Sequence, residues 1–263
     1  GLDVVTSSRN RKELFIYAIN HRMPLDAPAS QVGADSVVEI FKTTIGSKDV
    51  THLKTVEDPS VIISPNDLVG SPDGKSFYFT NDNGVKLPSP YSPFINPKTS
   101  SVGYCHVEKG CKIALANTVS SNGIAGAPNG TLYVASTAGG FVTFLEKQSD
   151  NSLVVSDTVN VGYALDNLSV DADGQLWLAV IPHVMKIMNY MLKDNTSKSP
   201  SIVSRVSINT GVNSFYGEKY RVENVFEDDG TVMSGLTTAA YDSKRHKLFM
   251  HGISSPALVV CKI

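Results

Sequence analysis

Oxygen-bearing side chains recur at one fixed distance before three predicted tight turns. Each is an Asn or Asp that lies seven residues upstream of an Asp-Gly or Asn-Gly dipeptide. The three pairs are Asn66 with Asp73, Asn122 with Asn129, and Asp166 with Asp173. Asn167 directly follows Asp166 and adds a further amide oxygen. A polar group left unpaired in an apolar strand costs about 1–3 kcal/mol, so these side chains need partners.

The chemistry that this residue set suits is the binding of a hard cation. If the fold brings several Asn and Asp oxygens to one buried point, they form a site for Ca²⁺ before any transition metal. The alternative interpretation is that Asn and Asp merely cap turns here, as they commonly do. One copy would favour turn capping, but three copies in register favour metal binding.

The elements that position these residues are predicted to be β-hairpins. In residues 163–180 an Asp173-Gly174 turn separates two apolar strands, and Asp-Gly supplies positive φ at little cost. The same unit recurs at 66–79 and 122–134, with degenerate copies at 8–17 and 242–250. Hairpins repeated every few tens of residues are typical of a β-propeller, whose symmetry places equivalent positions around one axis.

Composition is that of a globular domain and excludes some partners. The 263 residues are 41% hydrophobic and 18% charged, with a formal net charge of −2 and no basic run. This balance argues against nucleic acid or an anionic membrane surface as a partner. No apolar stretch reaches the length of a membrane span. A single all-β domain over residues 1–263 is therefore expected.

Two segments are predicted to shape a pocket. The Pro-rich loop 86–100, which contains Tyr91, is long for a compact domain, and such loops are commonly functional. Residues 182–191 have a Met-rich apolar side, including Met188, which suits core packing or a pocket lining better than a metal site. A further strand over residues 14–19 is predicted to end at Asn20 and His21.

The cysteines and glycosylation motifs suggest an oxidising compartment. Cys105 and Cys111 flank a predicted hairpin turn and could pair across it, which leaves Cys261 as a free thiol or without its partner. Asn129-Gly130-Thr131 and Asn195-Thr196-Ser197 are sequons in predicted surface turns. These features are compatible with secretion.

Motifs along the whole chain resemble those of the serum paraoxonase/arylesterase family, which are calcium-dependent lactonases. The motifs are Ile19-Asn20-His21, residues 64–69, 79–82, 122–124, 165–171, 175–178 and 185–187, and the closing residues 258–261. Members of that family are six-bladed propellers with two calcium ions in the central tunnel. The resemblance therefore implies calcium as cofactor and a small lactone or ester as substrate.

The resemblance also assigns roles to individual residues. It implies that Asn66, Asn122, Asp166 and Asn167 bind the upper, catalytic ion. It implies that Asp67 and the backbone carbonyl of Leu2 bind the lower, structural ion. His21 matches one histidine of a His–His dyad that is thought to activate the attacking water.

The sequence departs from the family pattern at its start. By the resemblance, the second dyad histidine would directly precede Gly1, and the first blade, with one acidic ligand for each ion, is expected to lie outside this sequence. Cys261 matches a cysteine whose partner lies in that segment, and Asn83 stands where vertebrate members tend to have a histidine. The expectation is an incomplete propeller of about five blades, a fragment or processed product. A missing segment or a partner chain would then cover the exposed strand edges.

Three functions remain as hypotheses. The first is a lactonase or arylesterase in which Ca²⁺ polarises the carbonyl and His21 assists water; no Gly-x-Ser-x-Gly motif supports a serine hydrolase. The second is a non-catalytic propeller that acts as a binding module. The third is a secondary-metabolite enzyme related to strictosidine-synthase-like propellers, which lack the full calcium-binding set.

Overall fold

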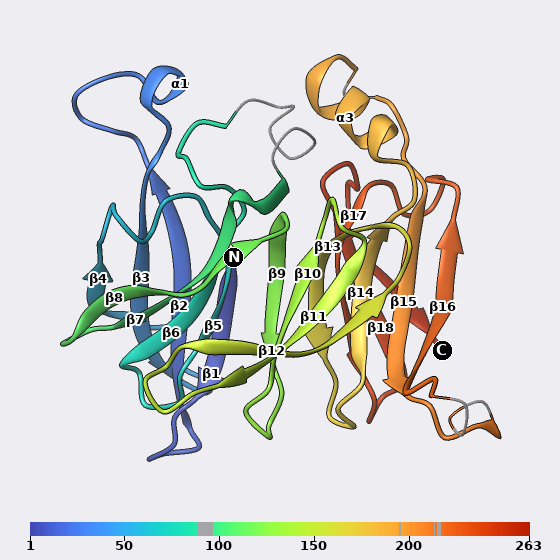
Figure 1. Cartoon of the computed structure of the whole chain (residues 1–263), viewed down its shortest axis with the longest axis horizontal. Coiled ribbons are helices and arrows are strands. Elements are labelled where there is room, and N and C mark those ends of the chain that lie inside the picture. The colour runs from blue at the N-terminus through green and yellow to red at the C-terminus, as the bar shows by residue number, and fades with distance from the viewer. Residues whose placement is uncertain (89–96, 195, 213, 215–216) are drawn as a thin grey trace. The chain divides into compact units, whose positions relative to one another are not determined.

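The chain is built from short antiparallel strands. The computed structural model describes residues 1–88, 97–194, 196–212, 214 and 217–263 (Figure 1). The described strands form five sheets, and within each sheet spatial neighbours are also neighbours in sequence. Sheets of this kind are the blades of a β-propeller, so the predicted all-β fold of about five blades is confirmed. The chain divides into two compact units, residues 1–124 with 146–154 and residues 125–145 with 155–263.

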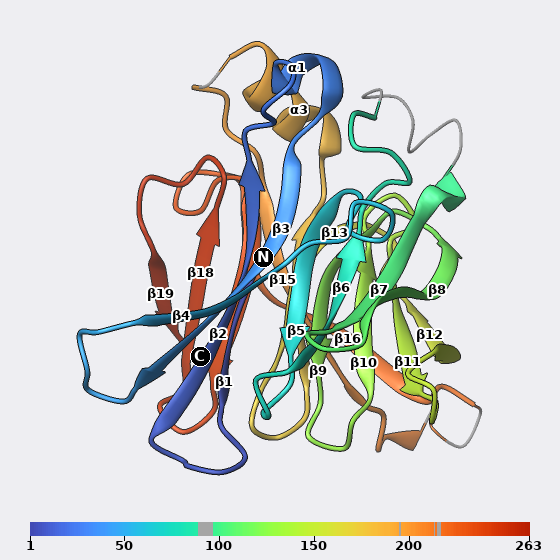
Figure 2. The ribbon, with the colours of Figure 1, turned by 90° about the vertical axis from the view of Figure 1, so that its left-hand side faces the viewer.

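Unit 1 contains the first two sheets. The first sheet, seen in Figure 2, consists of β1 (Leu2–Thr6), β2 (Glu13–Arg22), β3 (Asp35–Thr44) and β4 (Thr51–Val56). The short helix α1 (Ala29–Val32) lies between β2 and β3 in the chain. The second sheet consists of β5 (Pro65–Gly70), β6 (Ser76–Asn81), β7 (Ser100–His106) and β8 (Gly110–Thr118), and the 3-10 turn η1 (Pro97–Thr99) precedes β7.

The core of unit 1 lies between these two sheets. Tyr17, Phe77 and Phe79 are at most 1% exposed and belong to one apolar cluster. Gly70 is required at this contact because a Cβ there would lie 2.1 Å from the ring of Tyr17. The Tyr17 hydroxyl donates to the carbonyl of Ser71 at 2.8 Å, which fixes the ring against β5.

The remaining sheets follow the same plan. The third has the order β12 (Leu153–Asn160), β11 (Phe141–Lys147), β10 (Leu132–Ser136) and β9 (Ser121–Gly126). The fourth consists of β13 (Ala164–Val170), β14 (Leu176–Ile181), β15 (Ser201–Ile208) and β16 (Tyr220–Asp228), with helix α3 (Val184–Leu192) between β14 and β15. The fifth consists of β17 (Leu236–Asp242), β18 (Lys247–Gly252) and β19 (Val259–Lys262).

The predicted hairpin turns are present. Gly74, Gly130 and Gly174 have φ values of 74°, 93° and 80°, the left-handed region that the Asp-Gly and Asn-Gly signals predict. In unit 2 the turn after β13 is further held by Asp171, whose carboxylate accepts from the indole N–H of the buried Trp177 at 2.8 Å.

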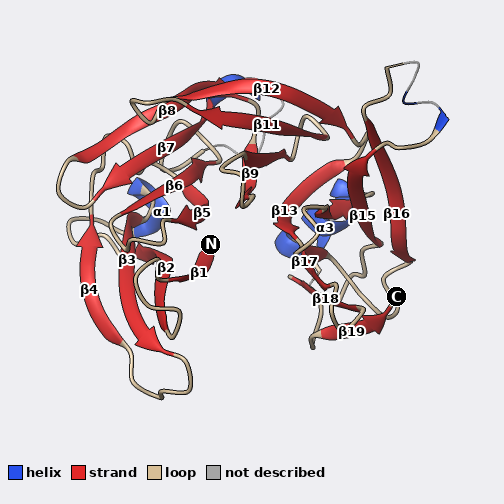
Figure 3. Cartoon of the chain, turned by 90° about the horizontal axis from the view of Figure 1, so that it is seen from below, coloured by secondary structure: helices blue, strands red, loops and turns tan. Residues whose placement is uncertain are grey.

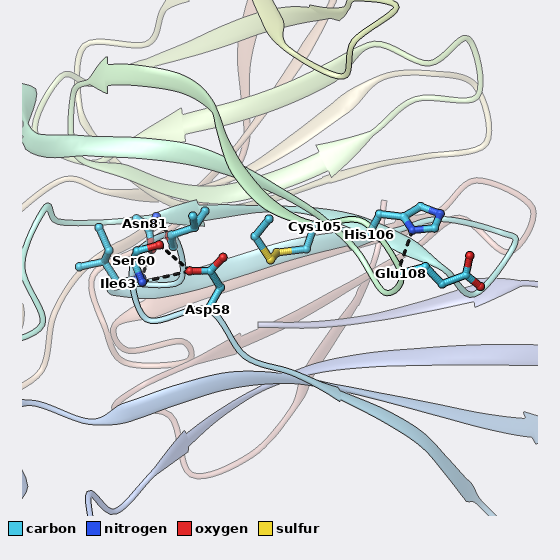
Figure 4. The surroundings of a disulfide bond; sticks show 9 residues. Asp58, Ser60, Ile63, Asn81, Cys105, His106 and Glu108 are labelled. Atoms are coloured by element: carbon cyan, nitrogen blue, oxygen red, sulfur yellow. Dashed lines mark hydrogen bonds between the residues drawn. A yellow bond between two sulfur atoms is a disulfide. The ribbon is translucent and has the colours of Figure 1, made fainter.

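The predicted disulfide is present in unit 1. Cys105 and Cys111 lie opposite each other on β7 and β8, and their sulfur atoms are bonded (Figure 4). Cys105 is buried in the unit 1 core. Cys261 is free within the described residues and packs against the apolar cluster of unit 2. Asn129 lies in an exposed turn, whereas Asn195 lies outside the described residues.

The first sheet differs from the prediction at His21. The strand was expected to end at Asn20 and His21, and β2 ends one residue later, at Arg22. His21 pairs with Ser36 and Arg22 with Asp35 on β3. The Arg22 guanidinium and the Asp35 carboxylate form an ion pair of 2.5 Å across the last pair of β2 and β3. The apolar pattern of the sequence gives no sign of this additional pair.

Candidate functional site

A one-residue β-bulge interrupts the inner strand of three sheets at the same place. Between Pro65 and Leu68, β5 advances three residues while β6 advances two. The interval from Leu165 to Leu168 on β13 shows the same mismatch against β14, and β17 gains one residue at Thr237. Bulges re-aim side chains and are common beside active sites. Asn66-Asp67 and Asp166-Asn167 are the residues inside the first two bulges.

The bulge in β5 is held by the facing strand. Thr80 on β6 is fully buried, and its hydroxyl accepts from the backbone N–H of Asp67 at 3.1 Å. The same hydroxyl donates to the carbonyl of Asn122 on β9 at 2.6 Å. The Oδ2 atom of Asp67 accepts from the N–H of Ile124, also on β9, at 3.0 Å. Within unit 1, β5 and β9 are therefore joined at two of the predicted ligand positions, 67 and 122.

The carboxylates around this bulge are desolvated. Burial raises the pKa of Asp67, although the N–H of Ile124 partly opposes that shift. Burial also raises the pKa of Asp3, whose Oδ2 accepts from the N–H of Gly70 at 2.8 Å. The N-terminus lies beside β5 (Figure 3), where the Gly1 nitrogen donates to the carbonyl of Asn66 at 2.7 Å. A nearby cation would favour the charged form of both carboxylates.

A third carboxylate, Asp82, connects the bulge with His21. Burial raises the pKa of Asp82, while hydrogen bonds with Ser64, Asn66 and Asn83 oppose the rise. The negative charge of Asp82 also acts on His21 and favours the protonated imidazole. Asn66 and Asp82 therefore belong to one polar network with the predicted catalytic histidine.

His21 is exposed, and one nitrogen of its ring has a hydrogen-bond partner. Its Nδ1 atom lies 2.8 Å from the hydroxyl of Ser36 on β3. Desolvation by the surrounding atoms is the largest influence on the ring and lowers the pKa of His21 from its ordinary value of 6.5. The imidazole is thus mostly neutral at pH 7, the form in which it can accept a proton.

The bulge in unit 2 repeats one feature of the first. Asn167 donates from its side-chain amide to the carbonyl of Thr237 on β17 at 2.8 Å. Asp67 and Asn167 each occupy the second place in their bulge, and each bonds to the backbone of the next inner strand. The hydroxyl of Thr137 adds a bond of 2.7 Å to the carbonyl of Leu165, next to Asp166.

The other predicted site residues have different surroundings. Leu2 lies on β1, pairs with Ala18 and is 64% exposed. Met188 lies on α3 and is half-buried, and Tyr91 lies outside the described residues. Among the described residues, no three His, Cys, Asp or Glu side chains form a group that could hold a metal. Three of the six expected ligands are Asn side chains, whose amide oxygens also bind Ca²⁺.

Sequence reasoning gave no separate role to Thr80, Asp3 or Asp82. Thr80 carries no signal, because threonine is an ordinary strand residue. Asp3 and Asp82 do carry a sequence signal, because each is an acidic residue in or directly after an otherwise apolar strand pattern.

Comparison with known proteins points to one family. The family model described as Arylesterase matches residues 7–261. Serum paraoxonase/arylesterase 2 of Rattus norvegicus is 30% identical over 215 residues, which cover 80% of this chain and 57% of the relative. Serum paraoxonase/arylesterase 1 of Homo sapiens is 26% identical over 244 residues, covering 91% and 62%. The chain thus spans about three fifths of the length of these relatives.

A solved structure supports the fold. A putative 6-phosphogluconolactonase from Bacteroides uniformis aligns with a TM-score of 0.54 at 13% identity, covering 98% of this chain and 80% of that protein. At this identity the similarity bears on the fold alone. No helix among the described residues is both long and apolar enough to cross a membrane.

Proposed function

The chain belongs to the arylesterase family, and we propose that it is a calcium-dependent hydrolase of lactones or aryl esters. The observation that carries the proposal is the family match over residues 7–261, joined to oxygen-bearing side chains in the bulges of β5 and β13. Small lactone or ester substrates are proposed on the same ground.

The donor residues of unit 1 suit hard cations. Asn66 and Asn122, proposed for the upper ion, and Asp67, proposed for the lower ion, offer only oxygen ligands, as Ca²⁺ prefers. The carboxylates of Asp3 and Asp67 lose solvation on folding, and a bound cation would compensate for that loss. The matching bulge supports the same ligand role for Asp166 and Asn167, and the family resemblance adds the carbonyl of Leu2.

The chemistry divides between the cation and the chain. A bound Ca²⁺ would supply Lewis acidity that polarises the substrate carbonyl and stabilises an oxyanion. In the tautomer that donates from Nδ1 to Ser36, the Nε2 atom of His21 carries the lone pair that accepts a proton from water. The Ser36 hydroxyl orients this ring, and Asp82 stabilises its charge once the proton has been taken.

Location in the secretory pathway is part of the proposal. Disulfides form and persist mainly in oxidising compartments, and the Cys105–Cys111 bond is of that kind. Roles for Tyr91 and Met188 in the substrate pocket, and a segment or partner that completes the propeller, remain proposals from the sequence.

The test is hydrolysis of phenyl acetate and a γ-lactone with and without a calcium chelator. We expect chelation to abolish both activities and added Ca²⁺ to restore them. His21→Gln should lower turnover by roughly 10²–10⁴-fold with calcium affinity unchanged, the usual size of a general-base contribution. His106→Gln is the matched control, because that ring bonds only to the N–H of Glu108 within the described contacts. Hydrolysis that persists under chelation would contradict the proposal.

A further inference from the structure

Thr80 is a buried polar residue that lies opposite the bulge in β5. It lies on β6 between Phe79 and Asn81, and all three are 0% exposed. It faces the β5 bulge, because Asn81 pairs with Pro65 and Phe79 with Leu68 on either side. A buried hydroxyl must find hydrogen-bond partners, so the identity of those partners shows what the residue does.

The hydroxyl of Thr80 bonds to two different strands. It has a single proton, and the shortest contact, 2.6 Å to the carbonyl of Asn122, is the bond that uses it. Its lone pair then accepts the N–H of Asp67 at 3.1 Å. One side-chain atom therefore links the bulge that carries Asn66 and Asp67 with the strand that carries Asn122.

We propose that Thr80 is a positioning residue that sets the spacing of the calcium ligands on β5 and β9. The inference rests on the proposed function and goes beyond it by naming a residue that contacts neither cation nor substrate. Without the hydroxyl, the N–H of Asp67 and the carbonyl of Asn122 would both lose a bond inside the protein. The Asp67–Ile124 bond would then be the remaining link of those described between the two strands at this point.

Threonine suits this role better than its close analogues. Valine has the same shape but supplies neither bond, so Thr80→Val changes hydrogen bonding at nearly constant volume. Serine keeps the hydroxyl and loses only the methyl group. Thr55 offers a matched control, because its hydroxyl bonds to the Glu39 carboxylate at 2.6 Å in the first sheet.

The experiment measures calcium affinity by titration calorimetry for the wild type, Thr80→Val, Thr80→Ser and Thr55→Val. We expect Thr80→Val to weaken calcium binding by about tenfold or more, as for loss of one well-made buried hydrogen bond. Thr80→Ser and Thr55→Val should stay within about threefold of the wild type, and amide exchange of Asp67 should accelerate only in Thr80→Val.

The outcomes separate this inference from the proposed function. Wild-type affinity in Thr80→Val would overturn the positioning role while leaving calcium binding intact. A wild type that binds no calcium would overturn both. If Thr80→Val does not fold, Thr80→Ser decides: retained affinity supports the role of the hydroxyl, and a tenfold loss shows that the methyl group, rather than the hydroxyl, sets the site.

Discussion

Replacing Asp67 by Asn separates the charge of this side chain from its shape. The Oδ2 atom of Asp67 accepts from the N–H of Ile124 at 3.0 Å, and the amide oxygen of Asn can accept the same bond. The backbone N–H bond to Thr80 is untouched. We therefore expect Asp67→Asn to fold normally and to lose one negative charge at the proposed calcium site.

The pH dependence of stability follows from the direction of the pKa shift. Burial raises the folded-state pKa of Asp67 above the ordinary value of 3.8. The folded state then holds the proton more tightly than the unfolded state, so this carboxyl lowers stability as the pH rises from its unfolded to its folded pKa. Without calcium, Asp67→Asn should lack that loss and be at least as stable as the wild type at pH 7.

In the presence of calcium we expect the opposite order of stability, with the wild type more stable than Asp67→Asn. A ligand present at 100 times its dissociation constant stabilises the folded state by about 2.7 kcal/mol. For a chain of this size that is a rise in melting temperature of roughly 5–10 °C. Asp67→Asn should lose most of this calcium-dependent rise, because a neutral amide binds Ca²⁺ more weakly than a carboxylate.

The assay is thermal unfolding at pH 5 to 8 in calcium and in chelator, with Asp73→Asn as control. Asp73 is also a carboxylate, but it lies in the exposed β5–β6 turn, where it bonds to the N–H of Lys75. The control should keep the full calcium effect. The reasoning is refuted if Asp67→Asn keeps that effect too, or if its stability in chelator falls well below that of the wild type.

Three further predictions test other parts of the structure. Asp166→Ala should abolish calcium binding and hydrolysis together, and unchanged affinity by calorimetry would remove Asp166 from the ligand set. Cys105→Ser with Cys111→Ser should lower the free energy of unfolding by about 2 kcal/mol in denaturant titrations, and two free thiols in non-reducing mass spectrometry of the wild type would contradict the bond. Gly70→Ala should lower it by about 1–3 kcal/mol, since its Cβ would meet the Tyr17 ring at 2.1 Å; full stability would mean that the ring can move.

The sequence predicted the hairpins well because their signals are local. An Asp-Gly turn needs positive φ whatever surrounds it, and Gly74 and Gly174 adopt it. The Cys105–Cys111 bond is local in the same sense, since a six-residue separation across one hairpin places the two side chains opposite each other. Both features depend on residues close in sequence, so little tertiary context is needed to predict them.

The bulges and the role of Thr80 could not be predicted in this way. Register is set by the pairing of two strands, and the sequence of β5 alone does not show that Asn66 and Asp67 together face one residue of β6. The end of β2 was misplaced for a related reason. His21 and Arg22 are polar, so the apolar pattern does not include them. They nevertheless pair with Ser36 and Asp35 on β3, and this pairing extends the strand to Arg22.

The bulge also affects the roles of the consecutive polar residues Asn66-Asp67 and Asp166-Asn167. In a regular strand two consecutive side chains point to opposite faces, whereas an extra residue releases both from that alternation. The second residue of each pair, Asp67 or Asn167, uses one side-chain atom to hold the next inner strand. Each therefore combines a structural bond with its proposed ligand role. Removing either side chain should disturb the spacing of neighbouring ligands as well as remove one. Asp67→Asn should change charge alone, because the amide oxygen can still accept from the N–H of Ile124. Asn167→Asp would also lose the N–H that bonds to the carbonyl of Thr237.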